Sequence, residues 1–206
     1  MLVGFTGAQC TGKTTLLKLL KNEPMKDGVY VYGDKWGFVD EVTRKVMKQG
    51  HSINRDGDDI TQLFILNEHL RNHTTGVDMV LDRCILDGYV YSSVLSNMGK
   101  VSEWVTSYAC ELLNLLVPKL DIIFYTSPED VPLVDDGVRS LNREFRQDVI
   151  DRYEELFAKD YYWMDKVTRL DGNIEDRMET ILNKINENEC IRQQQDYQAP
   201  GSNIRV

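Results

Sequence analysis

The sequence predicts an α/β fold in which a five-stranded parallel sheet carries helices on both faces. Two observations indicate this fold. Short apolar runs of strand length alternate along the chain with longer segments in which apolar residues recur at helical spacing. The first apolar run, residues 1–6, passes directly into a glycine-rich motif at residues 7–14, and the leucines after that motif recur as on a helix. Ligands of such a sheet bind at the carboxyl ends of its strands.

The glycine-rich motif reads G-x-x-x-x-G-K-T, the pattern of a phosphate-binding P-loop, and it lies between strand and helix as that loop requires. Gly7 and Gly12 let the backbone turn its N–H groups toward an anion. Lys13 is suited to neutralise the β- and γ-phosphates, and Thr14 to coordinate Mg²⁺. The motif therefore predicts a P-loop NTPase that binds ATP and Mg²⁺. Its nucleotide-binding residues are expected to be Gly7, Ala8, Gln9, Cys10, Thr11, Gly12, Lys13, Thr14 and Thr15.

The remaining elements follow in order along residues 1–188, which we interpret as one domain. Strands are expected at 1–6, 37–39, 77–81, 121–125 and 167–170, with a further strand-like piece at 29–32. Helices are expected after the P-loop, at 42–48, after Asp59, and at 85–98, 102–116, 139–159 and 174–187. Asp59 is expected to cap its helix, whose apolar face would be formed by Ile60, Leu63, Leu66 and Leu70. Residues 189–206 have no apolar period and are predicted to form a flexible tail.

The composition of the 206 residues is that of a globular protein with a net charge of −9. An acidic surface argues against nucleic-acid binding by the chain as a whole, although a local basic groove is compatible with it. The cysteines are far apart and are interpreted as free thiols, and the histidines form no metal-ligand set. No apolar run reaches the length of a membrane span and no signal peptide precedes the first strand. We therefore expect a cytoplasmic protein, with a homodimer left open.

Charged residues follow the second and third predicted strands, and parallel strands bring such residues to one edge of the sheet. Asp82 is placed like a Walker B carboxylate that holds Mg²⁺; the alternative is a helix N-cap. Arg83 is suited to a phosphate group, or else to a surface ion pair. Glu41 is suited to bind or deprotonate the acceptor hydroxyl. The alternative is an acidic residue in the first turn of a helix, where the helix dipole favours it. The general base is either Glu41 or Asp82. The expected substrate-binding residues are Glu41, Arg44, Arg83 and Asp87.

Arginines at helical intervals follow a glycine in the segment 135–146. In a kinase such a segment is a lid that closes over ATP and brings an arginine to the γ-phosphate. We expect Arg139 to take this catalytic role and Arg143 to contact the nucleotide. A solvated charged helix is the competing interpretation, above all for Arg143 and Arg146.

These motifs together resemble the P-loop kinase domain of NadR-type proteins, which phosphorylates nicotinamide riboside with ATP. The resemblance rests on the P-loop, Glu41-x-x-Arg44, Asp82 after the third strand and the stretch 134–141, and it covers most of residues 1–186. The Asp82-Arg83 pair is also similar to the acidic-Arg pair of deoxynucleoside and thymidylate kinases, and deoxynucleoside kinases place a general base where Glu41 stands. The stretch 171–177 resembles the turn that many small P-loop kinases place against the adenine ring, which implies a nucleotide contact at Gly172. No adenylyltransferase domain like that of most NadR proteins is found in this sequence.

The leading hypothesis is a Mg²⁺-dependent kinase that transfers a phosphoryl group from ATP to a nucleoside-like small molecule such as nicotinamide riboside or a deoxynucleoside. A deoxynucleoside monophosphate acceptor would need a further cation, for which Arg44 and Arg71 are candidates. A kinase of a modified base in DNA is a third possibility. The non-enzyme alternative is an NTP-dependent switch or ATPase.

Overall fold

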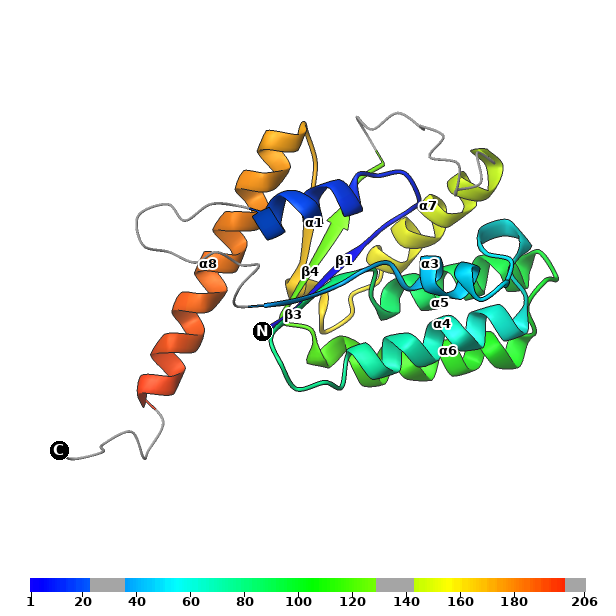
Figure 1. Cartoon of the computed structure of the whole chain (residues 1–206), viewed down its shortest axis with the longest axis horizontal. Helices are drawn as coiled ribbons and strands as arrows, with labels where there is room; N and C mark the ends of the chain where they lie inside the picture. The colour runs from blue at the N-terminus through cyan, green and yellow to red at the C-terminus, as the bar shows by residue number, and fades with distance from the viewer. Residues whose placement is uncertain (23–35, 129–142, 199–206) are drawn as a thin grey trace.

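A sheet of five parallel strands forms the centre of the computed structural model, which describes residues 1–22, 36–128 and 143–198 (Figure 1). The strands lie in the order β2-β3-β1-β4-β5, and every neighbouring pair is parallel. The predicted α/β class and five-stranded parallel sheet are therefore confirmed. The strands are β1 (Leu2–Thr6), β2 (Gly37–Val39), β3 (Met79–Asp82), β4 (Ile122–Thr126) and β5 (Val167–Leu170).

The central strand β1 is buried along its whole length because it lies between β3 and β4. Val3 is level with Val80 of β3 and with Ile122 of β4. Strand β4 is likewise buried at every residue. Strands that are covered on both faces have nearly continuous apolar sequences, which explains why these two are easy to recognise in the chain.

Helices cover both faces of the sheet (Figure 1). Apolar residues of α1 and α8 pack on one face against Val3 and Phe5 of β1. Residues of α4, α5, α6 and α7 pack on the other face, where Leu2 and Tyr125 point. Helices on both faces were predicted and are confirmed. The helices are α1 (Lys13–Asn22), α3 (Val42–Lys48), α4 (Asp59–Asn72), α5 (Ile85–Asn97), α6 (Glu103–Leu116), α7 (Arg143–Phe157) and α8 (Ile174–Gln198).

Helix α4 buries a face that only partly matches the one predicted. Its N-cap is Asp58, whose Oδ1 accepts a hydrogen bond of 2.8 Å from the backbone N–H of Thr61. Asp59 instead accepts bonds of 2.6 Å from the backbone and hydroxyl of Ser102. Ile60 is 57% exposed. The prediction from apolar spacing was wrong for Ile60 but is confirmed for Leu66, which is buried, and for Leu70, which packs against the core. The face is shifted because most of the side chains that α4 buries are polar. Its buried residues are Thr61, Gln62, Ile65, Leu66, His69 and Asn72.

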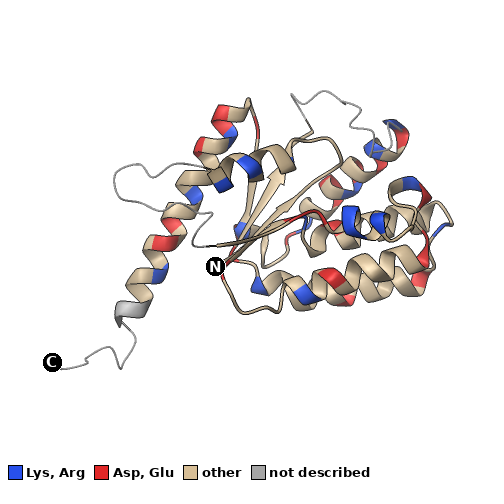
Figure 2. Cartoon of the chain, viewed as in Figure 1, with Lys and Arg blue, Asp and Glu red and all other residues tan. Residues whose placement is uncertain are grey.

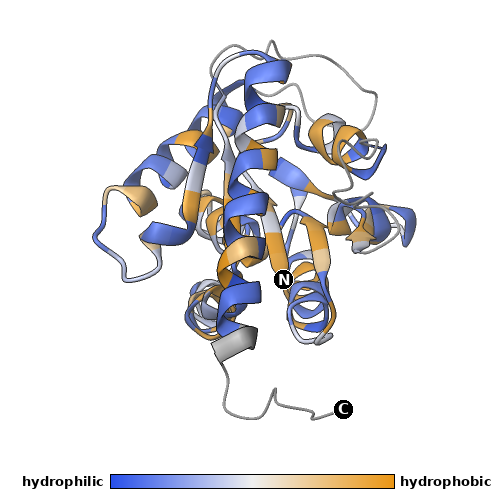
Figure 3. Cartoon of the chain, turned by 90° about the vertical axis from the view of Figure 1, so that its left-hand side faces the viewer, coloured by the Kyte–Doolittle hydropathy of each residue, from blue (hydrophilic) through white to orange (hydrophobic). Residues whose placement is uncertain are grey.

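Helix α8 is longer than the helix predicted at 174–187, since it continues to Gln198 and so includes part of the segment 189–206. Arg177 is buried in its first turns, and Met178, Ile181, Ile185 and Glu189 continue the buried face at helical spacing. The last of them is a glutamate, so the apolar period ends before the helix does. Arg192 pairs with Asp78 at 3.2 Å and adds a contact near the end of the helix. Figure 3 shows α8 in front of the sheet, with hydrophilic residues along much of its length.

Several predictions concern residues outside those that the structure describes. They are the strand-like piece 29–32, residues 139–142 of the helix predicted at 139–159, residues 135–142 of the lid segment, with Arg139, and residues 199–206 of the predicted tail. In the described ranges, no helix has both the length and the apolar character to cross a membrane. The four cysteines are free thiols, as predicted: Cys10, Cys84, Cys110 and Cys190.

Candidate active site

The P-loop joins β1 to α1 and is held in a curled form by glycine and threonine. Gly7 has φ +136° and Gly12 has φ +86°, a region that favours glycine. An added Cβ at Gly7 would also lie 2.7 Å from the Thr126 hydroxyl at the end of β4. The Thr11 hydroxyl donates to Ala8 O at 3.0 Å and lies 2.6 Å from the same Thr126 oxygen. The loop is therefore preorganised by its own bonds and by β4.

Lys13 is buried inside the P-loop, with 3% of its surface exposed. Its Nζ donates to Gly7 O at 2.9 Å, to Ala8 O at 2.6 Å and to Thr11 Oγ1 at 3.1 Å, all of which are uncharged groups. Burial, followed by repulsion from Arg83, lowers the pKa of Lys13 to about 7. A phosphate in the loop would supply the negative charge that restores the pKa of this amine.

The binding of Mg-ATP is expected to weaken as the pH rises above about 7, the pKa of Lys13 in the free protein. Because phosphate favours the ammonium form, the complex holds a proton that the free protein has lost, and affinity falls by at most about tenfold per pH unit. Titration calorimetry in buffers of different ionisation enthalpy would measure the proton uptake. Lys13→Arg, which stays charged, should bind without this slope. If the affinity of Lys13→Arg for Mg-ATP fell with pH as steeply as that of the wild type, Lys13 would not be the group that takes up the proton.

Thr14 and Asp82 form a pair of oxygen ligands at the end of the P-loop. The Thr14 hydroxyl donates to Asp82 Oδ2 at 2.7 Å, and Asp82 Oδ1 is buried without a hydrogen-bond partner among the described residues. Burial, with the nearby charge of Glu41, raises the pKa of Asp82. A buried carboxylate oxygen without a partner beside a hydroxyl fits Mg²⁺, which takes few protein ligands and completes its shell with phosphate and water. The predicted metal residues therefore lie together.

Arg83, directly after β3, is buried and links three parts of the site. Its Nε donates to Glu41 Oε1 at 2.8 Å, and its Nη1 donates to Asp87 Oδ1 at 2.5 Å and to Gly7 O at 3.3 Å. The guanidinium carbon also lies 5.1 Å from the centre of the Tyr91 ring. Arg83 has φ +81°, which is uncommon for a residue with a side chain. The ion pairs of Arg83 are buried ones, so the surface-pair alternative is wrong.

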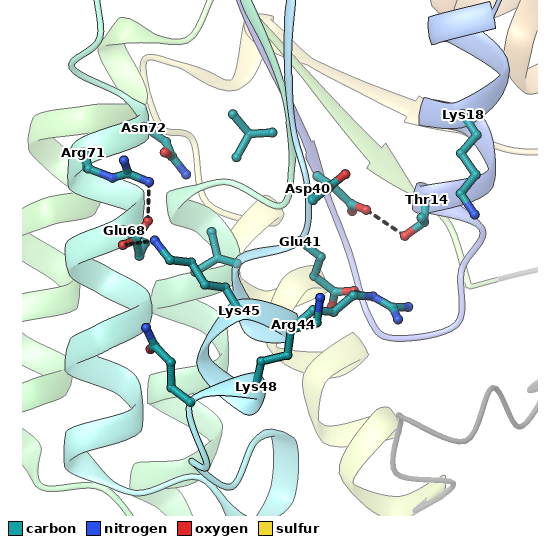
Figure 4. A pocket seen from close by; sticks show the side chains of 14 residues that line it. Thr14, Lys18, Asp40, Glu41, Arg44, Lys45, Lys48, Glu68, Arg71 and Asn72 are labelled. Atoms are coloured by element: carbon teal, nitrogen blue, oxygen red, sulfur yellow. Dashed lines mark hydrogen bonds and ion pairs between the residues drawn. The ribbon is translucent and has the colours of Figure 1, made fainter.

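Glu41 occupies the N-cap position of α3 at the end of β2 and is 6% exposed. Its Oε1 also accepts a bond of 2.8 Å from the Thr43 hydroxyl, and its Oε2 accepts one of 3.1 Å from Arg44 Nε. The pairing expected between Glu41 and Arg44 is therefore present. Figure 4 shows both side chains on the same side of the cavity as Thr14. The Glu41 carboxylate, which follows β2, thus lies in the same cavity as Thr14 and Asp82, the last residue of the neighbouring strand β3.

Asp87 lies on α5 and serves the fold as well as the site. Its Oδ2 accepts bonds of 2.8 Å from the Thr6 hydroxyl and 3.1 Å from the backbone N–H of Cys84, at the N-cap of α5. Its Oδ1 holds Arg83. The residue is 3% exposed. Asp87 therefore ties the end of β1, the start of α5 and the buried arginine together.

Two cavities adjoin this network. The larger has a volume of about 650 Å³, a size typical of small-molecule sites, and lies between α1, α3 and α4 (Figure 4). Its lining includes Thr14, Lys18, Glu41, Arg44, Arg71 and Asp82. The smaller has a volume of about 20 Å³, room for one water molecule, and lies behind Arg83. Its lining includes Thr43, Gln62, His69, Arg83, Asp87 and Tyr91.

Three polar residues beside Arg83 were missed by the sequence analysis. His69 is buried, and neither ring nitrogen has a hydrogen-bond partner among the described residues. Burial keeps the pKa of His69 well below its usual value, so the ring is neutral. Gln62 accepts a bond of 3.2 Å from the Ser92 hydroxyl, and the Tyr91 hydroxyl donates to Gln9 Oε1 at 2.9 Å. The spacing of Gln62 and His69, two helical turns apart on α4, could have indicated a shared polar face.

The other predicted nucleotide residues are more dispersed. Arg143 is exposed at the start of α7, whereas Arg146, one turn on, donates from Nε to Gln9 O in the P-loop at 3.2 Å. Thr15 is exposed on α1. Gly172 lies in the turn before α8 with φ +80°. Arg139 lies outside the described residues.

Comparison with known proteins identifies relatives of this fold. The sequence profile of a family described as an AAA domain matches residues 2–177. A structure of deoxyadenosine kinase from M. mycoides with the products dCMP and a flexible dCDP has a TM-score of 0.67 at 16% identity, covering 91% of this chain and 99% of that chain. The same kinase with bound dCTP has a TM-score of 0.63 at 17% identity, covering 91% and 100%.

A structure of NadR protein in complex with NR is similar as well, with a TM-score of 0.58 at 18% identity. The match covers 84% of this chain but 46% of that one, so the chain spans about half the length of NadR. No curated protein sequence matches significantly. The likeness to these structures confirms the expected resemblance at the level of the fold, which is a P-loop kinase-like α/β fold.

Proposed function

The chain belongs to the AAA domain family, and from this premise we propose that it is an ATP- and Mg²⁺-dependent kinase of a nucleoside-like small molecule. The observation that carries the proposal is the position of Glu41. A buried carboxylate paired with two arginines lines the same cavity as Thr14 and Asp82 of the nucleotide site. Phosphoryl transfer needs a nucleotide site and an acceptor-side group in one cavity, and the position of Glu41 in the cavity of Thr14 and Asp82 supports the proposal on that ground.

The proposed reaction moves one phosphoryl group. The acceptor hydroxyl oxygen attacks the γ-phosphorus, the bond from that phosphorus to the β–γ bridging oxygen breaks, ADP leaves, and Glu41 takes the hydroxyl proton. Lys13 holds the phosphates within the curled loop. Mg²⁺ bound to Thr14 and Asp82 would offset the charge on the phosphate oxygens. Arg83 orients Glu41, and Arg44 supports the same carboxylate from α3.

The rate of ADP release from Mg-ATP across a panel of acceptors tests this proposal. The panel holds nicotinamide riboside, the deoxynucleosides, their monophosphates and duplex DNA, with Lys13→Met as the blank. Strong stimulation by one nucleoside supports the proposal. Slow release that ignores every acceptor, with ATP binding retained, would overturn it in favour of an ATP-dependent switch.

Glu41→Gln is expected to lower kcat by about 10²–10⁴-fold, the contribution of a positioned general base, with little change in the KM for ATP. The amide keeps the shape of the side chain but cannot take the proton. Glu68→Gln is the matched control, because Glu68 lines the same cavity but pairs with Lys45 and Arg71 on its far side. If Glu41→Gln lost no more activity than Glu68→Gln, the general-base role of Glu41 would be wrong.

A nucleoside monophosphate acceptor is a second candidate, favoured by the cations around the larger cavity. Arg44, Lys45 and Lys48 lie on α3 and Arg71 lies opposite them on α4 (Figures 2 and 4). Arg44, Lys45 and Arg71 already pair with Glu41 or Glu68, so much of this charge is balanced. In the panel, this candidate predicts stimulation by a monophosphate with no response to the parent nucleoside.

A further inference from the structure

Arg177 is a buried arginine in the first turns of α8, with 3% of its surface exposed. Its guanidinium donates to backbone carbonyls of three separate segments. Nε donates to Gly172 O at 2.9 Å, Nη1 to Thr11 O at 3.2 Å and Nη2 to Ser127 O at 3.4 Å. One side chain thus joins the turn before α8, the P-loop and the residue after β4.

The position of Arg177 is unfavourable for helix α8 itself. A cation near the start of a helix lies at the positive end of the helix dipole, where acidic residues are preferred. Glu175 and Asp176 precede Arg177 and suit that end of the helix. Burying a guanidinium also has a desolvation cost, which its bonds to carbonyls offset. Helix stability therefore gives no reason for arginine here, whereas contact with the P-loop does.

The contact with Thr11 O acts on the peptide between Thr11 and Gly12. A carbonyl that accepts a hydrogen bond from a cation makes the N–H of the same peptide a stronger donor. In a P-loop the N–H groups of this stretch point toward the phosphates. The guanidinium therefore strengthens the anion-binding loop from behind, without touching the nucleotide.

We propose that Arg177 is a positioning residue for nucleotide binding, which fixes the Thr11–Gly12 peptide against the turn 171–173. Both the P-loop and this turn are expected to contact ATP, and Arg177 bonds to a carbonyl in each. The inference rests on the proposed nucleotide site and goes beyond it, because it makes the affinity for ATP depend on the packing of the C-terminal helix.

Arg177→Lys and Arg177→Met are expected to raise the Kd for Mg-ATP by about 10–100-fold, the range for losing hydrogen bonds from a charged group. Lysine keeps the charge but has a single nitrogen, which cannot span three segments. The Kd for inorganic tripolyphosphate with Mg²⁺ should rise by a similar factor, since that probe contacts the loop alone. The kcat at saturating ATP should change by no more than about twofold.

Arg192→Met is the matched control. It removes the same charge from the same helix, but Arg192 pairs with Asp78 away from the P-loop, so both Kd values should stay at the wild-type level. Thermal unfolding of each variant shows that binding is measured on folded protein; if Arg177→Met does not fold, Arg177→Lys decides. Kd values within about twofold of wild type in a folded Arg177 variant would overturn the inference. A wild-type protein that binds neither probe would instead overturn the proposed nucleotide site, and the inference with it.

Discussion

Lys13→Met is expected to lower the rate of phosphoryl transfer by about 10²–10³-fold or more, while the melting temperature stays at or above that of the wild type. The rate falls because the variant has no cation inside the P-loop to stabilise the transferring group. Stability is kept because the replaced ammonium group is buried, and removing it relieves the desolvation that lowers its pKa to about 7. ADP release and thermal unfolding are the two measurements.

The carbonyls that Lys13 contacts keep other donors in this variant. Gly7 O still accepts a bond from Arg83, and Ala8 O still accepts one from the Thr11 hydroxyl. Lys18→Met is the control, because Lys18 is an exposed residue of the same helix that also lines the cavity. Activity of Lys13→Met within about tenfold of the wild type would show that phosphate is bound elsewhere.

Arg83→Met is expected to destabilise the protein by about 3–5 kcal/mol, the usual effect of removing one partner from a buried ion pair. Glu41 and Asp87 are 6% and 3% exposed in the wild type, and the variant would remove the cation that their carboxylates share. Denaturant unfolding gives the free energy directly. Arg44→Met is the matched control: Arg44 pairs with the same Glu41 but is 36% exposed, so its loss should lower stability by no more than about 1 kcal/mol.

The role of charge at Arg83 can be separated from the role of packing. Adding Glu41→Gln and Asp87→Asn to Arg83→Met should recover part of the lost stability, because neutral amides are less costly to bury than unpaired carboxylates. If the triple variant is no more stable than Arg83→Met, then packing of the guanidinium on Tyr91 accounts for the loss. The charge argument would then be wrong.

The parts of the fold and site that depend on short stretches of chain could be predicted. The P-loop is contiguous in sequence, and strands such as β4 are apolar throughout because both faces are buried. The position of Asp82 at the end of β3, beside the Thr14 hydroxyl, could be expected because parallel strands end at a common edge of the sheet.

What could not be predicted depends on packing between distant segments. The alternation of strands and helices implies a parallel sheet but does not specify the order β2-β3-β1-β4-β5. The inward face of α4 was predicted only in part because Gln62 and His69 are polar, and only their proximity to Arg83 on another element explains their burial. The end of α8 was missed because Glu189, which continues the buried face, is a charged residue.

The strand order also determines when the phosphate-binding loop is completed as the chain is made. Strand β1 is the first strand along the chain, yet its neighbours are β3 and β4, whose residues are added much later. Pairings between segments so far apart in sequence form slowly, because a long stretch of chain must be closed into a loop first. Thr126, which supports Gly7, belongs to β4, and Arg177 follows later still. During synthesis, the P-loop can therefore acquire its native shape only after β3, β4 and the start of α8, which all follow it in the chain, have been made.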